Sequence, residues 1–120
     1  MGKILIVDDS SLIRSVAANA TKEAGHEPIV ASNGLEGLEK LGEHKFDLIF
    51  SDVNMPVMGG LEMVENIKEH KEYRYIPIIM LTTESNPVLK AKGKALGVKA
   101  WMLKPFNKNK FFMAVKKLLV

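Results

Sequence analysis

Four short apolar runs, each followed by a polar or charged residue, constrain the fold of this chain more than any other feature. The runs end at Val7, Ser51, Leu81 and Leu103. They are apolar at consecutive positions instead of alternate ones, which is typical of strands buried on both faces of a parallel sheet. Helix-like stretches separate the runs, so strands and helices are expected to alternate along the chain.

Five strands are expected, at residues 3–7, 28–31, 47–51, 76–81 and 98–103. The second is the most polar and is assigned to an edge, whereas the other four are expected to be buried on both faces. Parallel strands joined by right-handed helical crossovers form a doubly wound α/β sheet. The pattern favours the flavodoxin-like strand order 2-1-3-4-5 with five flanking helices, whose switch point lies between strands one and three.

Helix boundaries and inner faces follow from capping residues and from apolar spacing. The first helix is expected to begin at Ser10 or Ser11 and to end at Gly25, and the fourth to begin at Pro87. Asn107 is expected to cap the fifth. The side chains predicted to face the sheet are Leu12, Ile13, Val16, Ala17 and Ala20 in the first helix, Leu35, Leu38 and Leu41 in the second, Leu61, Val64 and Ile67 in the third, and Phe111, Val115, Leu118 and Leu119 in the fifth.

Chemically reactive side chains follow the four apolar runs. Asp8 and Asp9 follow the first run, Asp52 the second, Thr82 the third and Lys104 the last. The carboxyl ends of parallel strands share one edge of the sheet, and ligands bind outside that edge. Three carboxylates, a hydroxyl and an ammonium are therefore expected to lie together. This set suits a divalent cation and a phosphoryl group.

The composition of this cluster favours Mg²⁺. Three neighbouring carboxylates repel one another unless a cation screens them. The chain has no cysteine, and no histidine lies near these acids in sequence. Oxygen ligands alone indicate a hard ion, and Mg²⁺ commonly binds one or two carboxylates together with phosphate oxygens.

Each residue of the cluster also has an ordinary structural explanation. Asp8 and Asp9 could simply favour the start of a helix. Asp52 and Thr82 could be turn residues, and Lys104 could extend into solvent. In combination, Asp52 is the candidate nucleophile, because a carboxylate can attack phosphorus and form an acyl phosphate. Thr82 could then donate to a phosphoryl oxygen, and Lys104 would be the counter-charge of the acids.

Over its whole length the chain resembles the receiver domain of bacterial two-component response regulators, and most closely the single-domain chemotaxis type. The resemblance implies one receiver domain over residues 1–120 in which Asp52 accepts a phosphoryl group from a phosphohistidine on a histidine kinase. The residues that match the family in identity, order and spacing are Asp8-Asp9, Asp52-Val53-Asn54-Met55-Pro56-Val57-Met58-Gly59-Gly60, Thr82 and Lys104-Pro105.

The resemblance also implies how the metal is held and how the signal ends. Mg²⁺ is expected to bind Asp9, Asp52 and the backbone carbonyl of Asn54 directly, and to bind Asp8 largely through water. The family hydrolyses its own acyl phosphate. The side chains of Asn54 and Glu84 are expected to flank the attacking water.

A further implication concerns the conformational switch. Thr82 and Lys104 are implied to hold the phosphoryl oxygens, and the Lys104–Pro105 bond to be cis. In the family, a tyrosine or phenylalanine ring moves inward when the threonine shifts toward the phosphoryl group. That position is Trp101 here, and an indole is larger and needs a partner for its N–H when buried. Trp101 could therefore be a half-buried strand residue without a switching role.

Charge is distributed unevenly along the chain. All 14 acidic residues lie before residue 85, whereas residues 85–120 carry nine lysines. These lysines could form only a solvated surface, or a face that binds an acidic or amphipathic downstream protein. Nucleic acid is not expected as a partner, because this segment lacks arginine and any known binding motif. A symmetric dimer through this face would oppose like charges, so a monomer is expected.

Other functions fit the sequence less well than phosphoryl acceptance. An aspartyl-nucleophile phosphatase would carry its nucleophile at the first strand within an Asp-x-Asp motif, whereas here the candidate nucleophile follows the third strand as Asp52-Val53-Asn54. A flavodoxin-like cofactor binder would need a Ser/Thr-rich phosphate loop where Asp8 and Asp9 stand. A third alternative is a receiver detached from a DNA-binding regulator, but no output domain is visible after the fifth helix, where the sequence ends at Val120. Within the family, chemotaxis is expected, and a phosphate sink or a developmental regulator are the alternatives.

The expected protein is a signalling protein whose only catalysis is its own phosphotransfer and dephosphorylation. No apolar run approaches the roughly 20 residues that span a bilayer. The amino terminus has no apolar segment before a cleavage site, so it does not resemble a signal peptide. A cytoplasmic location is therefore expected, and no membrane partner.

Overall fold

Five strands and five helices alternate along the chain in the computed structural model, which describes residues 2–119. The strands are β1 (Lys3–Val7), β2 (Glu27–Ala31), β3 (Leu48–Ser51), β4 (Ile78–Thr82) and β5 (Ala100–Leu103). The helices are α1 (Ser11–Glu23), α2 (Gly34–Glu43), α3 (Gly60–Glu69), α4 (Pro87–Ala95) and α5 (Lys108–Leu118). All strand pairs are parallel, and the order β2-β1-β3-β4-β5 confirms the predicted topology.

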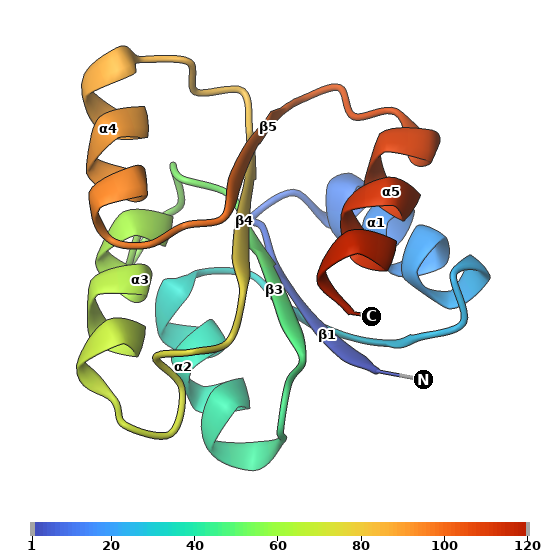
Figure 1. The fold of residues 1–120 in the computed structure, drawn as a ribbon, viewed down its shortest axis with the longest axis horizontal. Coiled ribbons are helices and arrows are strands. Elements are labelled where there is room, and N and C mark those ends of the chain that lie inside the picture. Colours follow the sequence, from blue (N-terminus) through green and yellow to red (C-terminus); the bar gives the residue numbers. More distant parts are fainter. Residues whose placement is uncertain (1, 120) are drawn as a thin grey trace.

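The sheet separates two layers of helices (Figure 1). α1 and α5 cover one face, and α2, α3 and α4 cover the other. Side chains of β1 alternate between the two cores: Ile4 and Ile6 pack with Phe111 of α5, and Leu5 and Val7 pack in the opposite cluster. Each central strand therefore contributes to both cores, as its continuous apolar run predicts.

Capping contacts confirm the predicted starts of the first, fourth and fifth helices, and a similar contact is found at α2. The side chains of Ser10 and Asn33 accept hydrogen bonds from backbone N–H groups at the starts of α1 and α2. Asn86 and Asn107 do the same for α4 and α5. Among residues 2–119, none of these helices has the length and apolar character needed to cross a bilayer.

Three apolar side chains that were expected to face the sheet are exposed instead. Leu12 and Val16 of α1 are 70% and 44% exposed, and Leu35 of α2 is 46% exposed. The short side chains of Ala17 and Ala20 are the ones that α1 buries against the sheet. A helix that packs through such small residues contacts the sheet along a narrow stripe, so larger apolar neighbours on its flanks face solvent.

The prediction that the fifth strand is buried on both faces is also wrong. β5 pairs only with β4 and is an edge strand, with Ala100 and Leu103 exposed. The fourth strand begins later than expected, at Ile78, because Pro77 cannot donate to the sheet. It extends one residue further, so Thr82 belongs to the strand itself.

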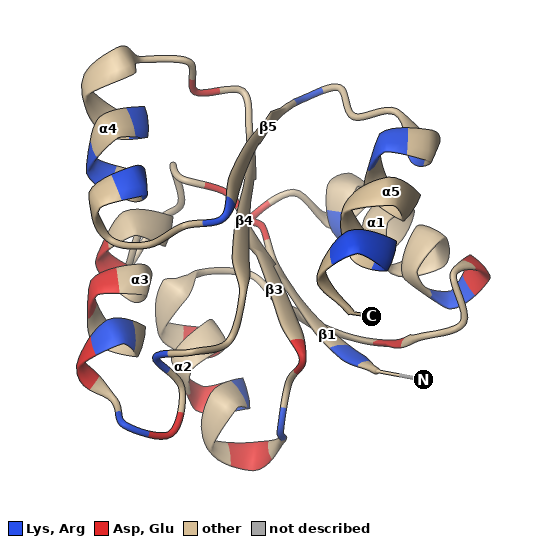
Figure 2. Cartoon of the chain, viewed as in Figure 1, with Lys and Arg blue, Asp and Glu red and all other residues tan. Residues whose placement is uncertain are grey.

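Opposite charges lie on different parts of the molecule (Figure 2). Lysines lie along α4 and α5, whereas acidic residues lie on α2 and α3 and beside the carboxyl ends of the central strands. The unequal distribution of charge in the sequence is therefore also a separation in space.

Candidate functional site

Asp8 and Asp52 lie side by side because β1 and β3 end at the same height in the sheet. Val7 pairs with Ser51 in the parallel register, so Asp8 and Asp52 follow at the same height. The Asp52 N–H donates to the Val7 carbonyl at 2.9 Å and locks this alignment. Together with Asp9, the two acids bring their carboxylate oxygens within 4.8 Å of one another. The predicted carboxylate cluster is therefore present.

Lys104 reaches this cluster from the end of β5. Its Nζ donates to Asp8 Oδ2 at 2.6 Å and to Asp52 Oδ2 at 3.0 Å. Burial would lower the pKa of the Lys104 ammonium, but the hydrogen bonds and charges of Asp8 and Asp52 outweigh it and raise this pKa. The lysine therefore stays charged and offsets part of the negative charge. The Lys104–Pro105 peptide bond is cis, as expected.

Asp52 is held firmly although it lies just beyond a strand. Its side chain accepts the Val53 N–H at Oδ1 over 2.7 Å, and the residue is 7% exposed. The start of α3 comes so close that a Cβ on Gly60 would lie 1.9 Å from the Asp52 carbonyl oxygen. Only glycine fits at position 60, and this close approach brings the helix against the site.

Thr82, Asn54 and Trp101 are joined through one residue, Glu84. The Glu84 N–H donates to Thr82 Oγ1 at 3.0 Å, and the Glu84 carbonyl accepts the Trp101 indole N–H at 2.7 Å. Its carboxylate accepts Asn54 Nδ2 at 3.3 Å and the Asn86 N–H at 3.2 Å. Within residues 2–119, no hydrogen bond joins the Thr82 hydroxyl to the three carboxylates. The predicted residues therefore form two adjoining groups, the acids with Lys104 and the network around Glu84.

The acidic group has the chemistry of a cation site. Asp8, Asp9 and Asp52 each offer a carboxylate oxygen, and these are the hard ligands that Mg²⁺ prefers. Lys104 occupies one oxygen of Asp8 and one of Asp52. Asp9 is exposed and leaves its carboxylate open to solvent. The three acids could therefore hold a metal ion.

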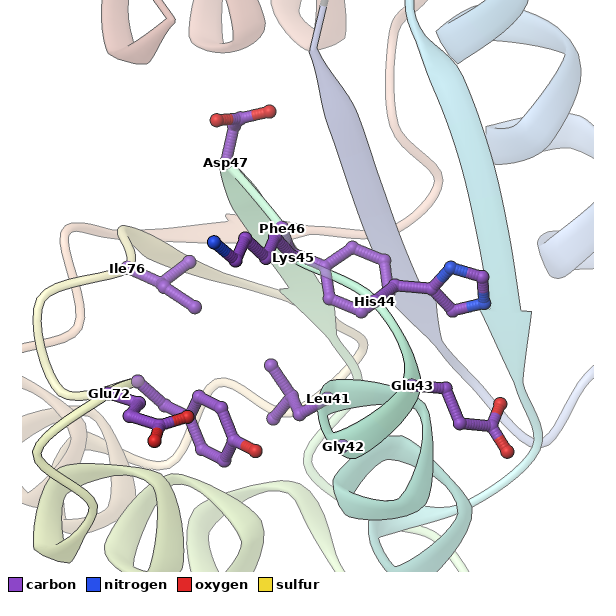
Figure 3. A pocket seen from close by; sticks show the side chains of 10 residues that line it. Leu41, Gly42, Glu43, His44, Lys45, Phe46, Asp47, Glu72 and Ile76 are labelled. Carbon is purple, nitrogen blue, oxygen red and sulfur yellow. The ribbon is translucent and has the colours of Figure 1, made fainter.

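A large groove lies away from these acids (Figure 3). It measures about 820 Å³ and is formed by the connections from α2 to β3 and from α3 to β4, at the opposite edge of the sheet. Its lining residues are Leu41, Gly42, Glu43, His44, Lys45, Phe46, Asp47, Glu72, Tyr73 and Ile76. None of the clustered acids lines it, so groove size does not indicate where the chemistry occurs.

Comparison with known proteins agrees with this geometry. Residues 4–116 match the response regulator receiver domain. PilG of Pseudomonas aeruginosa is 32% identical over 114 residues, which cover 95% of this chain and 84% of that protein. The chemotaxis protein CheY1 of Helicobacter pylori is 36% identical over 107 residues, covering 88% of this chain and 86% of that protein. The structure of chemotaxis protein CheY4 of Vibrio cholerae superposes with a TM-score of 0.92 and 42% identity, covering 98% of both chains.

The chain therefore belongs to the response regulator receiver family of two-component signalling and is a receiver domain of the CheY type. One residue at the site is absent from the sequence-based prediction. Arg14, in the first turn of α1, donates from Nη1 to the Asp8 carbonyl at 2.7 Å. Its signal in the sequence is a cation near the start of a helix, where the helix dipole disfavours positive charge.

Proposed function

We propose that residues 1–120 act as one receiver unit that accepts a phosphoryl group on Asp52 from a phosphohistidine of a partner histidine kinase. The observation that carries this proposal is the position of Lys104, whose ammonium lies 2.6 Å from Asp8 and 3.0 Å from Asp52. A cation fixed between carboxylates can neutralise the charge that a phosphoryl group brings. Such neutralisation and positioning supply most of the catalysis of phosphoryl transfer.

In the proposed transfer, a carboxylate oxygen of Asp52 attacks the phosphorus atom of the phosphohistidine. An O–P bond forms and the N–P bond breaks, with its electron pair remaining on the imidazole nitrogen. Lys104 and the Val53 N–H, which already bind the two oxygens of Asp52, hold the carboxylate in a fixed orientation for the attack. The Thr82 hydroxyl would bind a phosphoryl oxygen after giving up its contact with the Glu84 N–H.

The metal ligands in this proposal are Asp9, Asp52 and the backbone carbonyl of Asn54, with Asp8 acting largely through water. When bound, Mg²⁺ supplies positive charge to the phosphoryl oxygens and to the clustered acids. Asp8 supports this arrangement by holding Lys104 at 2.6 Å.

We also assign the end of the signal to Asn54 and Glu84. The two side chains are hydrogen-bonded at 3.3 Å, and Asn54 is exposed. Their polar groups are available to orient a water molecule toward the acyl phosphate. Hydrolysis would break its O–P bond, release inorganic phosphate and return Asp52 to the carboxylate.

The proposed output surface is α4, β5 and α5. Between α4 and β5 lies a groove of about 350 Å³ whose walls include Lys90, Lys94, Lys99 and Trp101. Movement of the Trp101 ring would change this groove, and its N–H contact with Glu84 connects the ring to the loop that follows Thr82. An acidic or amphipathic segment of a downstream protein fits the charge of this face. Binding that is insensitive to salt would contradict the electrostatic part of the proposal.

Chemotaxis is the pathway that the relatives favour. CheY1 of Helicobacter pylori and CheY4 of Vibrio cholerae carry that function in their names. We propose the same type of role for this chain, as a monomeric signalling protein that controls a protein target.

Phosphorylation is tested by incubating the chain with Mg²⁺ and acetyl phosphate and measuring its intact mass. We expect the mass of one phosphoryl group to be gained in the wild type, and no gain in Asp52→Asn or in EDTA. Equal gain in Asp52→Asn would place the reaction on another residue and overturn the proposal.

The same samples test the role of Trp101, which is the only tryptophan. If its ring moves on phosphorylation, the fluorescence should change in the wild type and stay constant in Asp52→Asn after addition of acetyl phosphate. Phosphorylation with unchanged fluorescence would argue that Trp101 is a strand residue without a switching role.

A further inference from the structure

Asp8 has all of its polar groups engaged, in contrast to Asp9. Its Oδ1 accepts the Ser10 N–H at 2.9 Å, and its Oδ2 accepts Lys104 at 2.6 Å. Its N–H donates to the Ala31 carbonyl at 3.0 Å. Within residues 2–119, no hydrogen bond to the Asp9 side chain is found, and the residue is exposed. No protein donor in this described range holds the Asp9 carboxylate, so the backbone sets where this side chain begins and which rotamers bring it to the other acids.

Arg14 contacts this backbone at two points. Its guanidinium Nη1 donates to the Asp8 carbonyl at 2.7 Å, and its own N–H donates to the Ser10 carbonyl at 3.0 Å. The Asp8 carbonyl belongs to the peptide group that joins Asp8 to Asp9. Since a peptide group is planar, a restraint on its oxygen also restrains the nitrogen and Cα of Asp9, which belong to the same group.

Charge alone does not explain an arginine at this position. A cation in the first turn of a helix is disfavoured by the helix dipole, by about 0.3–1 kcal/mol. A cation close to a metal site also opposes the binding of another cation. Both effects disfavour a positive charge at Arg14, so its contact with the Asp8 carbonyl needs an explanation other than charge.

We propose that Arg14 is a positioning residue for the metal site: by holding the Asp8 carbonyl, it restrains the backbone from which the Asp9 carboxylate would reach an ion held by Asp8, Asp9 and Asp52. This inference rests on the proposed function, in which Asp9 binds Mg²⁺ directly. The contact is charge-assisted and short, which gives it the strength to restrain an exposed corner.

The test is Arg14→Gln, with Mg²⁺ and Ca²⁺ affinities measured by calorimetry on the chain without a phosphodonor. Loss of a positive charge would by itself tighten the binding of both ions. Loss of positioning weakens binding, and we expect the Mg²⁺ dissociation constant to rise about tenfold, as for other residues that orient metal ligands. Ca²⁺ should be affected by a smaller factor, because it tolerates irregular geometry.

Two control variants separate positioning from general effects. Lys22→Gln removes a positive charge from the last turn of the same helix and should leave both affinities unchanged. Arg14→Lys keeps a donor of the same charge and should recover part of the lost Mg²⁺ affinity. Thermal unfolding of each variant checks that the fold is retained.

The outcomes distinguish this inference from the proposed function. Arg14→Gln that binds Mg²⁺ as tightly as the wild type, or more tightly, overturns the positioning role. Equal weakening for Mg²⁺ and Ca²⁺ with a lowered melting temperature also overturns it, since that is general loss of structure. A wild-type chain that binds no Mg²⁺ overturns the proposed metal site and this inference with it.

Discussion

Lys104 is the residue on which the charge balance of the site depends. The Lys104 side chain is 10% exposed, and the side chains of its two partners, Asp8 and Asp52, are 3% and 10% exposed. Breaking a buried pair by removing one partner costs about 3–5 kcal/mol, because the remaining charge is left without compensation. The raised pKa of Lys104 means that this stabilisation is complete at neutral pH and is lost only as the pH rises through the folded-state value, above the ordinary lysine range.

Lys104→Met is therefore expected to lower the free energy of unfolding in EDTA by about 3 kcal/mol, measured by urea denaturation at neutral pH. Mg²⁺ can replace the missing charge, so it should stabilise Lys104→Met more than it stabilises the wild type. Equal stabilisation of both proteins by Mg²⁺ would contradict this description of the site.

Gly60 allows α3 to approach Asp52 closely. Gly60→Ala should destabilise the chain by at least about 3 kcal/mol, since its Cβ would overlap the Asp52 carbonyl oxygen. Gly42→Ala is the matched control, because Gly42 lies in α2 and a Cβ there would have no neighbour within 4 Å. That variant should gain up to about 1 kcal/mol from helix propensity. If urea denaturation gives similar changes in the free energy of unfolding for the two variants, then the contact between position 60 and the Asp52 carbonyl does not require glycine.

Some residue-scale features were predictable from the sequence and others were not. The order of Asp8, Asp52 and Lys104 after apolar runs is enough to indicate that the three side chains cluster. The backbone of Val57, with φ 68°, was not predictable, because valine rarely adopts the left-handed conformation and no local signal in the sequence requires it here. The contacts of Glu84 likewise depend on the path of a loop, which sequence patterns do not define.

At the scale of elements, the sheet was easier to predict than the helix faces. A continuous apolar run is enough to identify β1, β3 and β4, since both faces of a central strand are covered. Apolar spacing in α1 identifies a helix, but not which flank the neighbouring α5 covers. Leu12 and Val16 therefore look like core residues in sequence and are exposed in the fold.

α4 is the helix with the least buried surface, since only Gly93 is buried within it. Asn86→Ala removes its cap and should cost about 1 kcal/mol. We expect that loss to appear as faster amide hydrogen exchange in residues 87–95, with little change in global stability. Asn107→Ala removes the same type of cap from α5, which buries Phe111 and Val115, so its cost should appear in global unfolding. Faster exchange throughout the chain in Asn86→Ala would contradict a locally unstable α4.

For the whole molecule, the separation of basic and acidic residues affects whether two copies of the chain can associate. On the lysine-rich face formed by α4, β5 and α5, Lys92 pairs with Glu65 at 3.2 Å and Lys108 with Glu23 at 2.7 Å. Lys104 of the same segment is paired with the acids of the site. The face nevertheless stays strongly positive, because residues 85–120 contain no acid. Two copies meeting symmetrically through α4, β5 and α5 would repel each other.

The chain is therefore expected to sediment as a monomer, and most clearly at low salt. At an ionic strength of about 0.01 M the Debye length is about 30 Å, so repulsion between lysine-rich faces is barely screened. Sedimentation velocity at low and at physiological salt measures this directly. A dimer that forms preferentially at low salt would mean that the association is attractive and involves other surfaces.

The proposed function depends most on the assignment of the phosphoryl group to Asp52. The chain is phosphorylated with acetyl phosphate and Mg²⁺, the acyl phosphate is reduced with borohydride, and peptide mapping locates the reduced residue. We expect conversion of Asp52 to homoserine, with Asp8 and Asp9 unchanged. Reduction at Asp8 or Asp9, or at none of the three in a chain that has gained a phosphoryl group, would contradict the assignment.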